Sequence, residues 1–326
     1  MENKAKGGID FINTIPKQIL TRLIEKYSPN NEDIELVVLY GDNFFKFKNS
    51  VDVIGAKVED LGYGFGILII KVNDLNRIIE LDGLQYIELP KILYTSAYDS
   101  NRASCIPSVW NNYNLTGEGI LVGFLDTGID YTHNAFKDTD GNTRIEYIYD
   151  LENEVVYDKN KINEALKSED PFSIVPEIDL SGHGTHVAGI ACAGGNINFD
   201  NYGVAYKSSI AMVKITSENS LRAALSTQLM RGLKFLMDKS NEINKPLVVN
   251  ISLSTNDGSH NGNSLLEKYI QTFTQLQKAV IVVAAGNEGN SAHHVGGNMK
   301  KEEELDLNIG DGEKSIILDF FQVCIS

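Results

Sequence analysis

Residues 182–189 of the chain read Gly-His-Gly-Thr-His-Val-Ala-Gly. The sequence Asp-Thr-Gly lies upstream at 126–128, and Ala-Gly-Asn-Glu-Gly lies downstream at 285–289. The three stretches supply a carboxylate, an imidazole and a side-chain amide, in that order along the polypeptide. A nucleophilic serine depends on this set of groups, because the acid and the base remove its proton and the amide stabilises the oxyanion.

The region around these motifs alternates apolar segments with helical ones. The strand candidates are apolar and β-branched, as in strands buried on both faces, and cover 120–126, 209–215, 247–253 and 279–285. The helical candidates cover 183–193, 220–241 and 265–278. This alternation predicts an α/β fold with a parallel sheet flanked by helices on both sides. Ligands bind such sheets at the carboxyl ends of the strands, where Asp126, Ser252 and Asn287 fall or lie just beyond.

The residue types fit acyl transfer by a serine. An alcohol is a weak nucleophile at neutral pH and needs a base, and His183 suits this because the pKa of histidine lies near neutrality. Asp126 at a strand end can hold the second ring nitrogen and stabilise the imidazolium. Asn287, directly after a strand, can donate to the developing oxyanion. The strand 249–254, which includes Ser252, Leu253 and Ser254, is expected to present an edge with which an extended peptide pairs.

Composition limits the classes of partner. The 326 residues include 42% hydrophobic and 9% aromatic residues, enough for a large core. A formal net charge of −15 disfavours nucleic acid and anionic membrane surfaces as partners. No signal peptide and no segment of membrane-spanning length is found. Three cysteines are too few for a disulfide framework, and Cys192 is expected to be a small core residue.

Domain organisation follows from changes of pattern along the chain. Residues 1–95 are expected to form a separate α+β unit, 96–297 a peptidase-like domain, and 298–326 the first strands of a further β domain. Within the first unit, helical spacing covers 15–27 and 73–81, and strand patterns cover 34–40, 65–72 and 85–93, the last interrupted by Pro90. The polar stretch 95–102 reads as a linker.

Other interpretations of the motifs are weaker. His183 and His186 lie three apart on a helix, but no third zinc ligand has convincing spacing, so neither a metal nor a cofactor is expected. The stretch 138–142, Asp-Thr-Asp-Gly-Asn, resembles half a calcium loop but favours a turn. Aspartic proteases also use Asp-Thr-Gly, in two copies on all-β halves, which this pattern does not fit. A nucleotide-binding doubly wound fold lacks its glycine-rich loop after the first strand.

The three motifs resemble those of the subtilisin-like serine proteases over residues 115–297. Four further segments, 113–119, 130–133, 250–260 and 286–294, are similar to the germination-specific Csp proteases of clostridia. This resemblance implies catalytic roles for Asp126 and His183, an oxyanion role for Asn287, and a peptide or protein substrate. It further implies a prodomain that acts in cis, a jelly-roll domain inserted before the serine, and cleavage of a cortex-lytic enzyme precursor during spore germination. The expected location is the spore, or otherwise the cytoplasm.

The chain departs from this family at two places. Ser254 stands where relatives usually have glycine at the end of the substrate-binding strand. The nucleophile of relatives lies in a Gly-Thr-Ser-Met-Ala sequence, whereas Gly-Thr-Ser occurs nowhere in these 326 residues. We therefore expect an incomplete precursor that is inactive alone and exposes apolar surface. The alternative is a non-catalytic pseudoprotease that binds or regulates other germination proteins.

Overall fold

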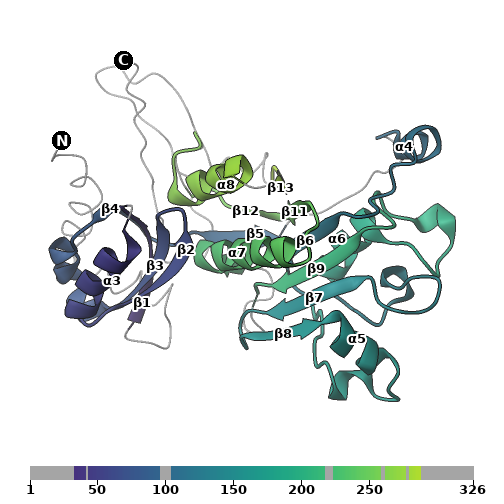
Figure 1. The fold of residues 1–326 in the computed structure, drawn as a ribbon, viewed down its shortest axis with the longest axis horizontal. Helices are drawn as coiled ribbons and strands as arrows, with labels where there is room; N and C mark the ends of the chain where they lie inside the picture. The colour runs from purple at the N-terminus through teal and green to yellow at the C-terminus, as the bar shows by residue number, and fades with distance from the viewer. Residues whose placement is uncertain are drawn as a thin grey trace, which may run out of the picture.

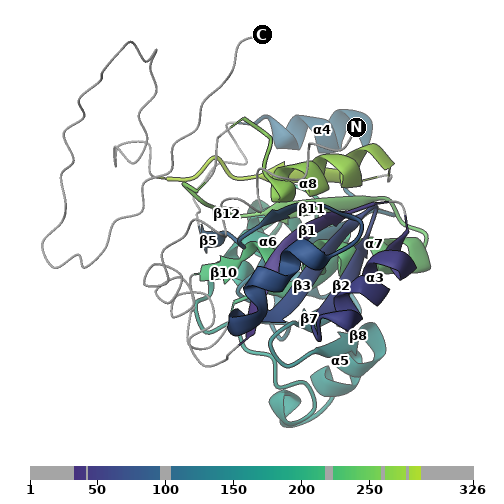
Figure 2. The ribbon, with the colours of Figure 1, turned by 90° about the vertical axis from the view of Figure 1, so that its left-hand side faces the viewer.

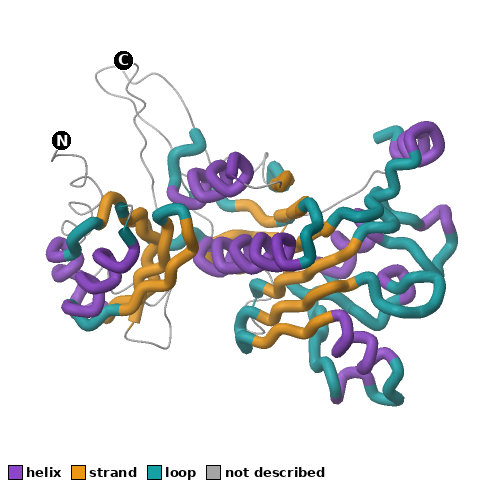
Figure 3. The backbone as a smooth tube through the Cα atoms, viewed as in Figure 1, coloured by secondary structure: helices purple, strands orange, loops and turns teal. Residues whose placement is uncertain are grey.

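The computed structural model describes residues 33–41, 43–95, 104–216, 223–257, 261–276 and 279–287. Two sheets lie side by side in it, a smaller one built from the N-terminal residues and a larger one built from the rest, with helix α7 between them (Figures 1 and 3). Predictions made for 15–27, for 96–103 and for 288–326 lie outside the described residues. No helix among the described residues is long and apolar enough to cross a membrane.

The N-terminal unit is an antiparallel sheet with the strand order β2-β3-β1-β4. Its strands are β1 (Asp33–Tyr40), β2 (Lys57–Gly62), β3 (Phe65–Lys71) and β4 (Leu84–Glu88). Helix α3 (Phe44–Val53) and the 3₁₀ helix η1 (Val72–Glu80) complete it. The predicted strands 34–40 and 65–72 are confirmed, and the predicted helix at 73–81 is this 3₁₀ helix.

Alternation along β1 and β3 gives this sheet two apolar faces. Leu36 and Val38 face α3 and η1 and belong to a core of the unit itself. Val37 and Ile67 point to the other face, where they join the core formed by α7 and α8. The sheet is thus covered on both sides, and Figure 2 shows the unit in front of the larger sheet. Charge also joins the two parts, because the guanidinium of Arg231 in α7 contacts two carboxylates of the unit.

The larger sheet has six strands in the order β13-β11-β6-β9-β7-β8. The predicted parallel strands appear as β6 (Leu121–Asp126), β9 (Ser209–Lys214), β11 (Leu247–Ile251) and β13 (Ala279–Val283). Two strands that the sequence analysis did not identify extend one side, β7 (Ile145–Asp150), parallel to β9, and β8 (Val155–Asp158), antiparallel to β7.

Helices cover the two faces of this sheet. On one face lie α7 (Ser226–Glu242) and α8 (Leu265–Leu276). On the other lie α5 (Lys159–Leu166) and α6 (His183–Cys192), where Cys192 is fully buried as predicted. The remaining helical segments are short and comprise α4 (Ile106–Tyr113) and the 3₁₀ helices η2 (Asn134–Phe136), η3 (Pro171–Ser173) and η4 (Phe199–Asn201).

A third, small sheet joins distant parts of the chain. Strand β5 (Ile92–Thr95) lies between β10 (Ala223–Leu225) and β12 (Leu253–Ser254) and is antiparallel to both. The prediction of one closing strand over 85–93 is therefore wrong. The strand pattern is interrupted at Pro90, and β4 and β5 belong to different sheets because the hydrogen-bond partners of β5, β10 and β12, lie beyond residue 220.

Strand β13 also departs from its prediction as a strand buried on both faces. It lies at the edge of the larger sheet among the described residues, and Val280, Val282 and Val283 are 57%, 51% and 52% exposed. Val280 and Val282 point to the face on which α6 covers β6 but does not reach β13. The apolar residues 279–283, which suggested a strand buried on both faces, thus form an edge strand.

Candidate active site

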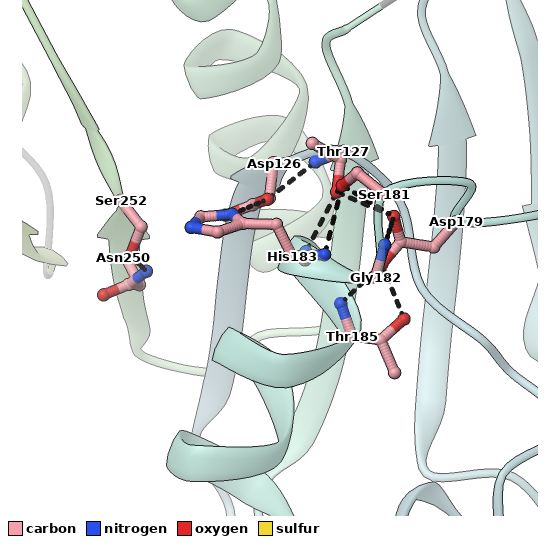
Figure 4. A network of polar contacts seen from close by, with 10 residues as sticks. Asp126, Thr127, Asp179, Ser181, Gly182, His183, Thr185, Asn250 and Ser252 are labelled. Atoms are coloured by element: carbon pink, nitrogen blue, oxygen red, sulfur yellow. Dashed lines mark hydrogen bonds and ion pairs between the residues drawn. The ribbon is translucent and has the colours of Figure 1, made fainter. Parts of the chain in front are cut away.

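Asp126 ends strand β6 at the carboxyl edge of the larger sheet, and its side chain is fully buried. Its Oδ1 atom accepts a hydrogen bond from the backbone N–H of Thr127 at 2.8 Å. The same atom lies 2.6 Å from Nδ1 of His183 (Figure 4). A carboxylate can only accept, so Nδ1 carries the hydrogen and the other ring nitrogen is left as the basic one. The two residues predicted as acid and base are therefore in direct contact.

The N-terminus of helix α6 holds His183 in place. Gly182 adopts a left-handed conformation with φ 72°, and the helix begins at the next residue. The first backbone N–H groups of a helix need outside acceptors. Here His183 N–H donates to Ser181 Oγ at 3.1 Å, and Gly184 N–H donates to Thr127 Oγ1 at 2.9 Å. Thr127, which follows Asp126, thus also caps the helix that carries His183.

Asp179 is a second organiser of the site that the sequence analysis did not identify. Its carboxylate accepts hydrogen bonds from Thr185 N–H and Oγ1, from Gly182 N–H and from Thr127 Oγ1, at 2.7 to 3.0 Å. Burial alone would raise the pKa of Asp179, but these hydrogen bonds outweigh burial and lower it. An acidic residue four positions before a helix start was the available sequence indication.

Two glycines allow the turn after Asp126 to approach helix α6. A Cβ atom on Gly184 would lie 2.2 Å from the carbonyl oxygen of Gly128 and 3.2 Å from Cβ of Asp126. A Cβ atom on Gly128, whose φ is +126°, would lie 2.4 Å from Oε1 of Glu177. The distances to the carbonyl oxygen of Gly128 and to Oε1 of Glu177 are far below van der Waals contact. The close packing of the turn 126–128 against the start of α6 therefore requires glycine at both Gly128 and Gly184.

The remaining nitrogen of His183 turns toward the strand that carries Asn250 and Ser252 (Figure 4). Asn250 Nδ2 donates to Ser252 Oγ at 2.8 Å, and Ser252 is buried. The following strand, β12, consists of Leu253 and Ser254. The polar side chains that end β6 and β11 thus flank the imidazole, as expected for neighbouring parallel strands.

The edge of β12 is already paired. Leu253 lies opposite Thr95, and Ser254 lies opposite Tyr94 of strand β5. On its other side β5 pairs with residues 223–225 of β10. Residues 92–95 therefore lie antiparallel between two strands from residues 223–254 of the chain. The side chain of Ser254, which replaces the usual glycine, does not prevent this pairing.

Asn287 lies four residues beyond the end of β13 and is exposed. Strand β13 runs parallel to β11 and β6, so its carboxyl end lies at the same edge of the sheet as Asp126. The preceding residue, Gly286, lies beside Ser254, because a Cβ atom on it would be 3.3 Å from Cβ and Oγ of that serine. Asn287 thus follows a contact with β12, and its role in an oxyanion hole stays a prediction.

The described residues contain no cluster of side chains that fits a metal ion. Among the described residues no group of three or more His, Cys, Asp or Glu side chains is placed to hold a metal ion. The stretch 138–142 forms a turn, as predicted, in which Asp138 Oδ1 accepts from the N–H groups of Asp140 and Asn142. The carboxylate that resembled a calcium ligand therefore stabilises its own loop.

Comparison with known proteins assigns the family. A family model described as the subtilase family matches residues 117–308. The chain belongs to the subtilase family. A second model, described as the Csp protease B prodomain, matches residues 3–91 of this subtilase. Strand β5 begins directly after that match.

Solved structures and curated relatives agree with this assignment. The structure of the Clostridium perfringens CspB protease is 97% identical, with a TM-score of 0.64, and the match covers 67% of this subtilase and 47% of that chain. Fervidolysin from Fervidobacterium pennivorans is 18% identical with a TM-score of 0.52, covers 80% of this chain and 41% of that one, and shows the fold alone. The PII-type proteinase of Lacticaseibacillus paracasei is 26% identical over 264 residues, which are 75% of this chain and 13% of that protein. This subtilase thus spans less than half the length of each of these three relatives.

Proposed function

We propose that this chain belongs to a serine endopeptidase in which Asp126 and His183 act as the acid and the base and Asn287 stabilises the oxyanion. The observation that carries the proposal is the 2.6 Å contact between His183 Nδ1 and Asp126 Oδ1 at the carboxyl end of β6. This contact fixes the tautomer of the imidazole and stabilises its charged form when it takes a proton from the nucleophile. The other ring nitrogen, turned toward β11, is the atom that takes that proton.

The substrate is a peptide or protein bound as an extended strand. Support for this comes from β5, which lies antiparallel between β10 and β12 where such a peptide would pair. Main-chain hydrogen bonds of this kind recognise a backbone of any sequence. Ser252, Leu253 and Ser254 are the residues that we propose for substrate binding.

We further propose that the 326 residues alone do not acylate. The serines after Asn287 are Ser291, Ser315 and Ser326, and none follows a Gly-Thr sequence. Acid, base and oxyanion groups without a nucleophile can bind and polarise a peptide but leave it intact.

Labelling with a serine-directed fluorophosphonate tests this proposal. The chain as given is expected to stay unlabelled, and a labelled serine would identify the nucleophile and contradict the proposal. A second arm purifies the chain together with a C-terminal half that carries the Gly-Thr-Ser-Met-Ala sequence. Hydrolysis of a fluorogenic peptide should then appear, should vanish in His183→Ala, and should fall by about 10⁴-fold in Asp126→Asn. Full activity in either variant would refute the assigned roles.

The Csp-like prodomain and the 97% identical CspB structure support a setting in spore germination. We propose that the protease is made as a precursor, is associated with the spore, and cleaves the precursor of a cortex-lytic enzyme. Processing between Leu93 and Ser104 would cut the chain within or after β5, and intact-mass analysis of the protein purified with its C-terminal half would locate the cut. A germination-specific precursor that is left uncleaved by active protease would argue against this substrate.

A pseudoprotease that binds or regulates germination proteins is the second candidate. Gly-Thr-Ser does not occur in these 326 residues, and the intact pair of Asp126 and His183 favours catalysis over this candidate. The genomic sequence beyond codon 326 discriminates between the two. A Gly-Thr-Ser-Met-Ala sequence there, in frame or shifted by one base, supports the protease, and its absence supports the binding role.

A further inference from the structure

Glu177 is a buried carboxylate near the proposed acid–base pair, and the chemistry proposed above gives it no role. Glu177 precedes helix α6 by six residues and is 1% exposed. Its Oε1 atom is buried and has no hydrogen-bond partner among the described residues. That atom faces Gly128, two residues after Asp126, because a Cβ atom on Gly128 would lie 2.4 Å from it. A buried carboxylate oxygen without a partner costs free energy, so its position needs a reason.

One lysine connects Glu177 to the strand that neighbours Asp126. Lys214 Nζ lies 3.4 Å from Glu177 Oε2 and donates to the carbonyl oxygen of Ile178 at 3.2 Å. Lys214 ends β9 and pairs in register with Asp126. The lysine therefore clamps the segment that leads into α6 against the carboxyl end of the sheet. Glu177 thus faces the turn that follows Asp126, and Lys214 lies opposite Asp126 in the sheet, in a buried environment where charges interact more strongly than in water.

We propose that Glu177 is a positioning residue of the catalytic pair, and that its ionisation is coupled to the charge of His183 through Lys214 and the Gly128 turn. This rests on the proposed function, because it deepens the regulation of the same site. A neutral Glu177 leaves the positive charge of Lys214 uncompensated and disfavours the imidazolium. An ionised Glu177 compensates that charge and favours the imidazolium.

The surroundings of Glu177 place its ionisation in the range where histidine also titrates. Burial raises the pKa of Glu177 to about 7, against the opposing effect of Lys214. The other groups that face it are Asp150 of β7 and Asp179 of its own loop, which raise the pKa further, and the hydroxyls of Tyr131 and Tyr157. Asp150 is itself held by Asn153, and Asp179 by the N-terminus of α6.

NMR titration of the histidine side chains in the 326-residue chain tests the proposal without any need for peptidase activity. His183→Asn identifies the signal of His183 among the six histidines. Glu177→Gln keeps the shape and removes the charge, so the midpoint of His183 should fall by about 0.5 pH unit or more. Lys214→Met removes the opposite charge, so the midpoint should rise. The matched control is Glu118→Gln, an exposed Glu–Lys pair with Lys207 at 3.5 Å, which should move the midpoint by less than about 0.1 pH unit.

Opposite shifts in Glu177→Gln and Lys214→Met are the result that a merely structural role would not give. Equal shifts in Glu177→Gln and Glu118→Gln, or shifts of one sign in Glu177→Gln and Lys214→Met, overturn the proposal. Should the variants unfold, the unsubstituted chain still decides, because its His183 signal must show a second inflection at the midpoint of Glu177 measured by ¹³C. A single inflection there overturns the coupling. If instead Asp126→Asn leaves the His183 midpoint unchanged, the proposed catalytic pair fails, independently of Glu177.

Discussion

At the scale of single residues, the turn after Asp126 tolerates no side chain. Gly128 has a φ of +126°, and a Cβ atom there would lie 2.4 Å from a buried carboxylate oxygen. We expect Gly128→Ala to lower the free energy of unfolding by about 3 kcal/mol or more, since backbone strain and a buried clash add. Urea denaturation measures this. Gly119→Ala is the matched control, because its φ is +82° and the space around it is open, and it should cost about 1–2 kcal/mol. Equal losses in the two variants would show that the contact with Glu177 is unimportant.

The raised pKa of Glu177 also makes stability depend on pH. The carboxyl has an ordinary pKa of 4.5 when unfolded and a pKa of about 7 in the fold, so between these values the folded state binds more protons than the unfolded state. Its contribution is therefore fully present below pH 4.5 and is lost as the pH rises through 7, in total about 3 kcal/mol. Thermal melts from pH 5 to pH 8 should show a fall in Tm that Glu177→Gln reduces. A parallel pH profile for the variant would contradict the raised pKa.

The sequence identified Asp126, His183 and Asn287 because each lies in a short motif of distinctive composition. It did not identify Asp179, and it did not identify Glu177. Their roles depend on how the loop before α6 folds back onto Thr127 and Lys214, and no local pattern of apolar residues encodes such a contact. Sequence reasoning thus proposed the groups with catalytic chemistry and missed the two carboxylates of the loop beside them.

At the scale of elements, helix α7 joins the N-terminal unit to the peptidase region through charge as well as through apolar packing. The guanidinium of Arg231 binds Glu35 with two nitrogens, at 2.8 and 3.2 Å, and binds Glu59 at 2.6 Å. Burial alone would lower the pKa of Arg231, but the bonds to the two carboxylates raise it. The arginine is therefore charged in the fold, and its removal leaves two partly buried carboxylates side by side.

We expect Arg231→Ala to lower the free energy of unfolding by about 2–3 kcal/mol, a value reduced from that of a fully buried pair because both glutamates are partly exposed. Chemical denaturation checks it. Lys234→Ala provides the control on the same helix, since its pair with Asp238 is solvent-exposed and should contribute less than about 0.5 kcal/mol. Similar losses in both variants would mean that apolar contacts alone join the two units.

The strands of the larger sheet were predictable where they form long apolar, β-branched runs, as in β6, β9 and β11. Strands β7 and β8 were missed because polar and aromatic residues interrupt their apolar pattern. The break between β4 and β5 had a local indication in Pro90. The partners of β5 had none, because β10 and β12 lie more than a hundred residues further along the chain. Such long-range pairing depends on the whole fold and cannot be predicted from a local sequence pattern.

At the scale of the whole molecule, the exposed apolar side chains of the larger sheet lie mainly on its two edge strands. The edge strand β13 exposes Val280, Val282 and Val283, and only the opposite edge strand, β8, exposes comparable valines among the described strands. We expect the 326-residue chain to bind an apolar fluorescent dye and to unfold over a broad temperature range, since exposed apolar surface and incomplete covering weaken cooperativity.

A double substitution locates that surface. Val280→Thr together with Val282→Thr should reduce dye binding, whereas Val156→Thr on β8 should change it less, because the valines of β8 are only 37% and 43% exposed. Differential scanning calorimetry gives the width of the transition. One sharp transition of a soluble monomer with no dye bound would refute this view of the molecule.

The position of β5 has a consequence for the occupancy of the proposed substrate site. If an extended peptide binds between β10 and β12 as proposed, β5 competes with it as though β5 were present at a local concentration on the order of millimolar, because β5 and the two strands are parts of one polypeptide. A peptide in micromolar supply and of comparable intrinsic affinity would then occupy few molecules. Scission of one backbone bond between β5 and helix α4 would replace that local concentration by the bulk concentration of the released piece. After that cut, a free peptide would reach the position between β10 and β12 more easily as the released piece is diluted.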